Sequence, residues 1–124
     1  MIKIKRLAKS FLYAVRGLSK TFKEEQNFKI HTFIAVVVIL IGWYVGISRY
    51  EWIFLVLIIG LVMLMEIANS AVERIADVLK PRINSYVKEI KDITAAGVLV
   101  ASVIAVIVGL IIFMPYAFGS HINF

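Results

Sequence analysis

Long apolar runs alternate with short charged stretches along this chain. No formal charge occurs in the nineteen residues between Lys29 and Arg49, and none occurs after Asp92. A helix needs about 20 predominantly apolar residues to cross the hydrocarbon core of a bilayer. The pattern therefore predicts membrane-spanning helices at about residues 30–48 and 92–114.

The middle apolar segment is shorter than the other two. Its uncharged run, residues 52–65, has fourteen residues, which is too few for a crossing. Neither Gly nor Pro lies between Leu61 and Pro81, so the helix can continue through the polar residues that follow, and Pro81 is a natural stop. We predict a second span at about residues 52–79 that carries carboxylates at one end.

A basic segment precedes the first span. Within it, Leu7, Phe11 and Phe22 recur at helical spacing with lysines between them, which predicts an amphipathic helix at about residues 4–23 on the membrane surface. The alternative is a basic anchor that only fixes topology. No short apolar core and cleavage site follow, so the segment does not resemble a signal peptide. The predicted fold is one all-α membrane domain over residues 1–124, with three spans and a surface helix.

Lysine and arginine counts predict the orientation. Eight such residues precede the first span, Arg49 alone lies in the first loop, five lie in the second loop, and none follow the third span. Because positive charge concentrates on the cytoplasmic side, the N-terminus is expected inside the cell and the C-terminus outside. The predicted location is a bacterial plasma membrane.

Composition narrows the possible functions. The chain is 61% hydrophobic, has a mean hydropathy of +0.91 and a net charge of +6, and contains no cysteine. Ordinary soluble domains are about 45–50% apolar, so a water-soluble domain is excluded, as are disulfides and thiol nucleophiles. The positive charge follows the flanks of the spans, where topology and anionic lipids explain it, so nucleic acid is not an expected partner.

One face of the predicted second span is polar. Glu66, Asn69, Glu73 and Asp77 lie at positions i, i+3, i+7 and i+11, which share one side of a helix. Ionisable residues within membrane segments are costly and are functional candidates by default. The alternative is that Glu73 and Asp77 lie at the level of the lipid headgroups and are merely solvated.

Further charged pairs come to the same side of the membrane in this topology. Glu24-Glu25 precedes the first span, and Lys91-Asp92 opens the third. Carboxylates from two helices can bind magnesium, a lysine at a helix N-terminus suits phosphate, and a deeper carboxylate can deprotonate a hydroxyl. This set fits phosphoryl transfer from a magnesium nucleotide to a lipid alcohol, although no P-loop or protein-kinase motif is present.

The polar segment has a recognisable pattern. Residues 66–77, Glu-Ile-Ala-Asn-Ser-Ala-Val-Glu-Arg-Ile-Ala-Asp, resemble the E-x-x-N-[ST]-A-[IV]-E-x-x-x-D signature of the small bacterial membrane diacylglycerol kinases. The resemblance covers nearly the whole chain. Other matching blocks are Arg6-x-x-Lys9-x-x-x-Tyr13, Glu25-x-x-Phe28 and Lys91-Asp92.

The resemblance implies a homotrimer whose active sites form between subunits at the cytoplasmic interface. It implies that Glu66 is the catalytic base and that Asn69 supports the base and the phosphate. By the same resemblance, Glu25 and Glu73 would hold Mg²⁺ on the ATP phosphates, and Lys91 would neutralise the transferring phosphate. The residues expected to bind the nucleotide are Arg6, Lys9, Tyr13, Asp77 and Asp92.

One departure concerns the acceptor. The diacylglycerol-phosphorylating members have a glutamate where this chain has His31, and residues 27–31 and 109–115 look like the Gram-positive branch, which prefers undecaprenol. We therefore expect an undecaprenol kinase that makes undecaprenyl phosphate, with a diacylglycerol kinase that makes phosphatidic acid as the alternative. A small proton- or cation-coupled transporter and a structural or pore-forming protein are remoter alternatives. His31 and His121 are too far apart to suggest a metal site.

Overall fold

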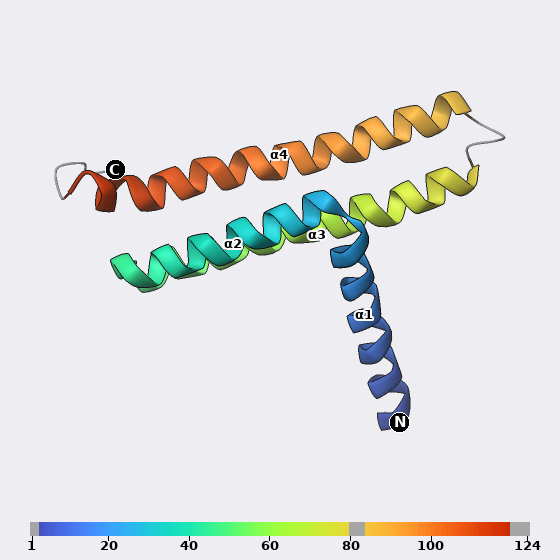
Figure 1. The fold of residues 1–124 in the computed structure, drawn as a ribbon, viewed down its shortest axis with the longest axis horizontal. Coiled ribbons are helices and arrows are strands. Elements are labelled where there is room, and N and C mark those ends of the chain that lie inside the picture. The colour runs from blue at the N-terminus through green and yellow to red at the C-terminus, as the bar shows by residue number, and fades with distance from the viewer. Residues whose placement is uncertain (1–2, 80–83, 120–124) are drawn as a thin grey trace.

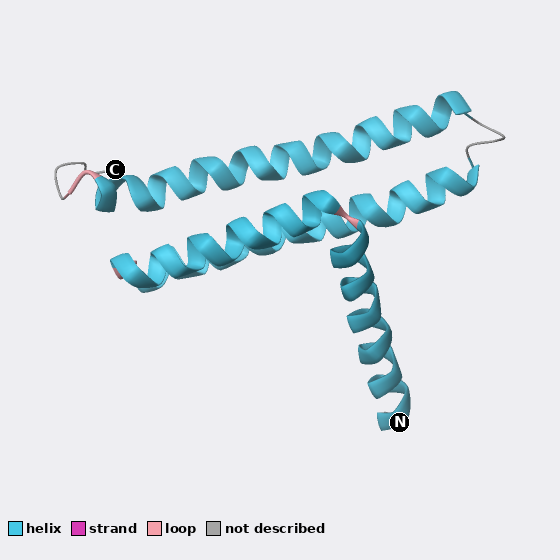
Figure 2. Ribbon diagram, in the orientation of Figure 1, coloured by secondary structure: helices cyan, strands magenta, loops and turns pink. Residues whose placement is uncertain are grey.

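The computed structural model describes residues 3–79 and 84–119, and these residues are almost entirely helical (Figures 1 and 2). The helices are α1 (Ile4–Glu24), α2 (Gln26–Val45), α3 (Arg49–Leu79) and α4 (Asn84–Ala117). Within the described ranges there is no strand. Pro81, the predicted helix stop, lies outside these ranges, as do Lys80, Arg82 and His121.

Three of the helices, α2, α3 and α4, are long enough and apolar enough to cross a membrane. This confirms the prediction of an all-helical chain with three candidate spans and one further helix. At about 1.5 Å per residue, the 31 residues of α3 extend for about 46 Å, well beyond the roughly 30 Å of hydrocarbon in a bilayer. The surplus length accommodates the polar residues from Glu66 onward.

The spans pack unevenly. Helix α4 lies alongside α3, α2 packs on another side of α3, and α1 leaves the bundle at a steep angle (Figure 1). On α1 both the apolar side chains, such as Leu7 and Phe11, and the lysines are exposed. The placement of α1 on a membrane surface therefore stays a prediction.

A single residue, Glu25, separates α1 from α2. Its backbone is extended, with φ −101° and ψ 111°, and its N–H donates to Thr21 O at 2.9 Å. The Glu25 carbonyl in turn accepts from Lys29 N–H in the first turn of α2. The chain thus turns without a loop, and the turn places a carboxylate at the corner between the two helices.

The opposite end of α2 uses a different turn. Gly46 adopts a left-handed conformation with φ +72°, which residues with a side chain rarely adopt, and its N–H bonds to Gly42 O. Ser48 and Glu51 then form a reciprocal capping box: Ser48 N–H donates to Glu51 Oε1 at 2.9 Å, and Glu51 N–H donates to Ser48 Oγ at 3.3 Å. Helix α3 therefore begins at a fixed point.

One buried stripe runs along α3. It starts with Leu55, Ile58 and Val62, which is the apolar part, and continues with Glu66 and Ser70. Leu55 and Ile58 form the main apolar cluster together with residues from the α2–α3 turn and from α4. The same helix face that packs the core at one end is therefore polar at the other, which places polar groups inside the bundle.

Candidate functional site

Glu66 is the most deeply placed carboxylate of the sequence-predicted set. Only 5% of its surface is exposed, and its Oε1 lies 2.6 Å from Nδ1 of His31 on α2. Neither atom has a partner with hydrogen-bond geometry among the described residues, so the pair is a close polar contact by distance. The structure thus pairs the proposed base with the residue at which this chain departs from the diacylglycerol-phosphorylating pattern.

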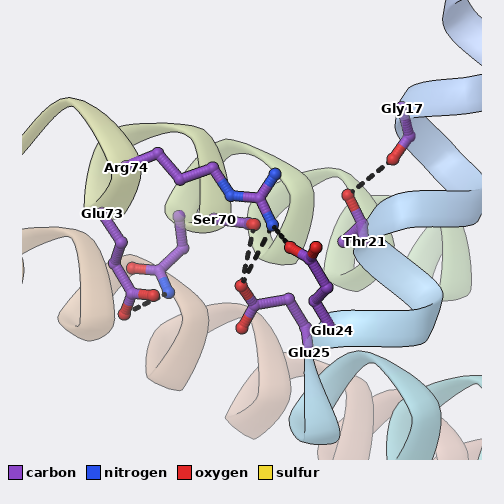
Figure 3. A network of polar contacts seen from close by, with 8 residues as sticks. Gly17, Thr21, Glu24, Glu25, Ser70, Glu73 and Arg74 are labelled. Atoms are coloured by element: carbon purple, nitrogen blue, oxygen red, sulfur yellow. Dashed lines mark hydrogen bonds and ion pairs between the residues drawn. The ribbon is translucent and has the colours of Figure 1, made fainter.

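Glu25 reaches α3 from the corner between α1 and α2. Its Oε1 accepts a hydrogen bond from Ser70 Oγ at 3.0 Å, one turn beyond Glu66, and lies 3.9 Å from Arg74 Nη2 (Figure 3). Arg74 also bonds Glu24 Oε2 at 2.5 Å. The two adjacent carboxylates are therefore held toward α3 by one hydroxyl and one guanidinium.

Asn69 and Glu73 interact along the same helix. Asn69 Nδ2 donates to Glu73 Oε1 at 3.3 Å across one turn. The other polar atom of the amide, Oδ1, is buried and has no hydrogen-bond partner among the described residues. An oxygen acceptor and a half-buried carboxylate therefore lie together on the side of α3 next to the Glu66–Ser70 stripe.

The cationic residue of the predicted set, Lys91, lies on α4. Its Nζ donates to Asp77 Oδ1 at 2.6 Å, which links the polar ends of α3 and α4. Asp77 and Asp92 are both exposed. The lysine is thus held next to the α3 carboxylates by a contact that solvent and a ligand can reach.

The residues predicted for the nucleotide on α1 are not brought to the α3 carboxylates within one chain. Arg6, Lys9 and Tyr13 are all exposed, and the N-terminal part of α1 points away from the bundle (Figure 1). The guanidinium of Arg16 instead lies over the Tyr13 ring, with its Cζ 6.0 Å from the ring centroid. A single chain therefore contains the carboxylates of the site but not the whole predicted nucleotide pocket.

An apolar groove of about 350 Å³ lies among α2, α3 and α4. Its walls include Val62 and Met63 of α3 and Ala105 and Gly109 of α4, and His31 is its ionisable lining residue. The groove therefore runs along the apolar part of the bundle and reaches the histidine that contacts Glu66.

Comparison with known proteins gives a consistent result. A family model described as prokaryotic diacylglycerol kinase matches residues 12–113. The chain belongs to this family. It is 37% identical to an undecaprenol kinase of Bacillus subtilis over 112 residues, which cover 90% of this chain and 91% of the relative.

Other relatives in the family are named diacylglycerol kinases. The chain is 36% identical to one from Synechocystis over 86% of its length, where it spans 61% of the relative. It is 32% identical to another from Haemophilus influenzae, over 82% of this chain and 86% of the relative. This member of the prokaryotic diacylglycerol kinase family is a lipid kinase, and its three apolar helices fit a bacterial membrane protein.

Kinases of this family transfer phosphate from ATP, generally with a divalent metal. The oxygen atoms of this site suit that metal: Glu73, Glu25 and the unpaired Asn69 Oδ1 are hard donors of the type that Mg²⁺ prefers. The described residues contain no group of three acidic or histidine side chains that could hold a metal alone. Magnesium commonly keeps waters and substrate phosphates as its other ligands, so a small donor set from the protein is sufficient.

Three contacts in the site were not assigned by sequence reasoning. They involve Ser70, Arg74 and His31, of which the sequence analysis noted only His31, as a departure from the family pattern. Ser70 lies four residues after Glu66, so helical periodicity alone could have placed both on one face. The partners of Arg74 and His31 lie on other helices, and no spacing within the sequence indicates them.

Proposed function

We propose that this lipid kinase phosphorylates undecaprenol with ATP to give undecaprenyl phosphate. The observation that carries the proposal is the buried carboxylate of Glu66 at the end of an apolar stripe, beside a groove that runs through the bundle. A lipid alcohol has a long apolar chain and one polar hydroxyl. The arrangement offers an apolar surface for the first and a proton acceptor for the second.

The reaction is a direct transfer. The hydroxyl oxygen of the acceptor attacks the γ-phosphorus of ATP, and the bond from that phosphorus to the oxygen bridging to the β-phosphate breaks. ADP leaves with that electron pair, and the hydroxyl proton passes to the carboxylate of Glu66 as general base. Asn69 supports the geometry of the base and the phosphate, since its amide lies one turn from Glu66 and bonds Glu73.

Charge in the site is balanced by groups from several helices. Glu25 and Glu73 would hold Mg²⁺, which when bound neutralises the nucleotide phosphates and orients them. Lys91, held by Asp77 at 2.6 Å, is close enough to the α3 carboxylates to neutralise the transferring phosphate. Asp77 and Asp92 bind the nucleotide with Lys91, at the end of the bundle that faces the cytoplasm.

The rest of the nucleotide pocket comes from another copy of the chain. Arg6, Lys9 and Tyr13 lie exposed on α1, away from the carboxylates of their own chain. Large apolar side chains such as Phe33 and Leu99 are also exposed on the spans. A homotrimer with shared active sites would bring α1 to a neighbouring site and cover part of this apolar surface, with α1 on the cytoplasmic membrane surface.

Diacylglycerol is the alternative acceptor, favoured by the relatives in Synechocystis and Haemophilus influenzae. The two acceptors are separated by competition: purified protein in mixed micelles receives equal mole fractions of undecaprenol and diacylglycerol with radiolabelled ATP and magnesium. We expect undecaprenyl phosphate as the main product. Phosphatidic acid as the main product would establish the alternative, and labelling of neither lipid would refute direct phosphoryl transfer to a lipid alcohol.

A further inference from the structure

His31 occupies a position between the apolar groove and the buried carboxylate. Its ring lines the groove, and its Nδ1 lies 2.6 Å from Glu66 Oε1. The side chain of His31 is 26% exposed, whereas that of Glu66 is 6% exposed. A ligand that moves along the groove therefore reaches the imidazole and the carboxylate at the same point.

Among the described residues, the neighbouring hydroxyls on α2 and α3 are engaged elsewhere. From His31 to Gly42, α2 has one other polar side chain, Thr32, and its hydroxyl donates to Phe28 O at 2.8 Å. On α3, the hydroxyl of Ser70 is used by Glu25. A buried carboxylate that lacks a hydrogen-bond partner is strongly disfavoured, and His31 Nδ1, 2.6 Å from Glu66 Oε1, is the polar atom placed to serve as one.

Resting on the proposed lipid-kinase function, we propose that His31 is a positioning residue for the base. Its Nδ1–H donates to Glu66 Oε1 and fixes the carboxylate plane, so that Oε2 is presented to an acceptor hydroxyl arriving at the polar end of the groove. The close contact with His31 is made by Oε1. The proton of the acceptor hydroxyl goes to Oε2, while the imidazole keeps its own proton.

The kinetic test compares three variants of α2. His31→Leu removes the donor and keeps an apolar side chain of moderate size, whereas His31→Gln keeps an N–H that can reach the carboxylate. Since a misplacement of about 1 Å can cost roughly 10²-fold in rate, we expect kcat of His31→Leu to fall between about tenfold and a hundredfold. The KM for ATP stays unchanged, His31→Gln recovers most of the rate, and Thr32→Val, the matched control, turns over like the unmodified protein.

A second measurement tests the contact without turnover. The chain contains two histidines, so His121→Gln leaves His31 as the single imidazole for NMR of labelled ring nitrogens. In this background we expect a protonated, hydrogen-bonded Nδ1 whose resonance shifts when Glu66 is changed to Gln. A Nδ1 resonance that Glu66→Gln leaves unmoved would refute the pairing, whatever the activity.

The outcomes separate this inference from the proposed function. If the unmodified protein phosphorylates a lipid alcohol and His31→Leu retains its full kcat, the positioning role is refuted and the proposed function stands. If the unmodified protein phosphorylates no lipid alcohol, both fail. Loss of kcat in His31→Leu, recovery in His31→Gln and an unchanged KM for ATP together support the role, because a general loss of folding would not be restored by one N–H.

Discussion

The two ends of α3 both carry carboxylates, but they differ in how those groups are satisfied. At the Ser48 end, Glu51 Oε1 accepts from Ser48 N–H at 2.9 Å and from Tyr116 OH at 2.5 Å. At the other end, Glu66 Oε1 lies 2.6 Å from His31 Nδ1, and among the described residues neither this oxygen nor the buried Asn69 Oδ1 has a hydrogen-bond partner.

The difference follows from what each end has to do. The bonds of Glu51 start α3 and tie it to the last turn of α4, so they use up the hydrogen-bonding capacity of the oxygen they share. At the Glu66 end, oxygen atoms inside or beside a largely apolar bundle remain available for hydrogen bonds. Leaving them unpaired does not by itself stabilise the fold. When polar groups at one end of a helix are paired and those at the other end lack hydrogen-bond partners, the unpaired end is a place where a substrate can supply the missing partners.

The largest expected effect comes from exchanging one carboxylate at each end for its amide. Glu66→Gln removes the proposed proton acceptor, and because general bases contribute about 10²–10⁴-fold, we expect kcat for lipid phosphorylation to fall by roughly 10³-fold. Glu51→Gln, the matched change at the other end of α3, should leave kcat within about twofold. Turnover of radiolabelled ATP with the lipid acceptor in mixed micelles measures both.

The folding of these variants distinguishes a chemical loss from a structural one. Glu66→Gln should keep its helical circular dichroism and its oligomeric size in detergent. A Glu66→Gln protein with more than a tenth of the original kcat would remove Glu66 from the base role. A Glu51→Gln protein as inactive as Glu66→Gln would remove the distinction between the two ends.

Much of the fold could be predicted from the sequence because bilayers impose a length and an apolar composition on a span. The uncharged runs around Ile34 and Ile104 indicated two spans, and the lack of Gly and Pro after Leu61 indicated that the third helix continues into polar residues. The turn at Glu25 could not be located in this way. Neither Gly nor Pro marks it, and the break depends on packing of α1 and α2 against α3.

The site could be predicted only in part. Glu66, Asn69 and Glu73 share a helix, so their common face follows from spacing, although the structure buries Glu66 and leaves Glu73 partly exposed. The contact of His31 with Glu66 joins two helices whose relative rotation no local pattern specifies. For the same reason, charge counts gave Arg74 a topological role and did not predict its contact with Glu24.

A smaller effect is expected from Glu73→Gln, which tests the available oxygen atoms as metal ligands. Loss of one charged ligand should shift the magnesium concentration for half-maximal activity upward by at least about tenfold, equivalent to roughly 1.4 kcal/mol. The control is Glu89→Gln, an exposed carboxylate of α4 outside the proposed site. An identical magnesium titration for the two variants would exclude Glu73 from the metal site.

The smallest effect is expected at the Ser48 end of α3. Ser48→Ala removes the side-chain cap that accepts from Glu51 N–H, and loss of such a cap costs about 1 kcal/mol. The midpoint of thermal unfolding in detergent should therefore fall by a few degrees, while kcat and the magnesium dependence stay unchanged, since Ser48 is at the far end of α3 from Glu66. Thr32→Val, already the kinetic control for His31, provides a comparison that removes a hydroxyl from a helix interior. If Ser48→Ala lowered kcat as strongly as His31→Leu, the two ends of α3 would be coupled, and the Ser48 end would contribute to catalysis as well as to stability.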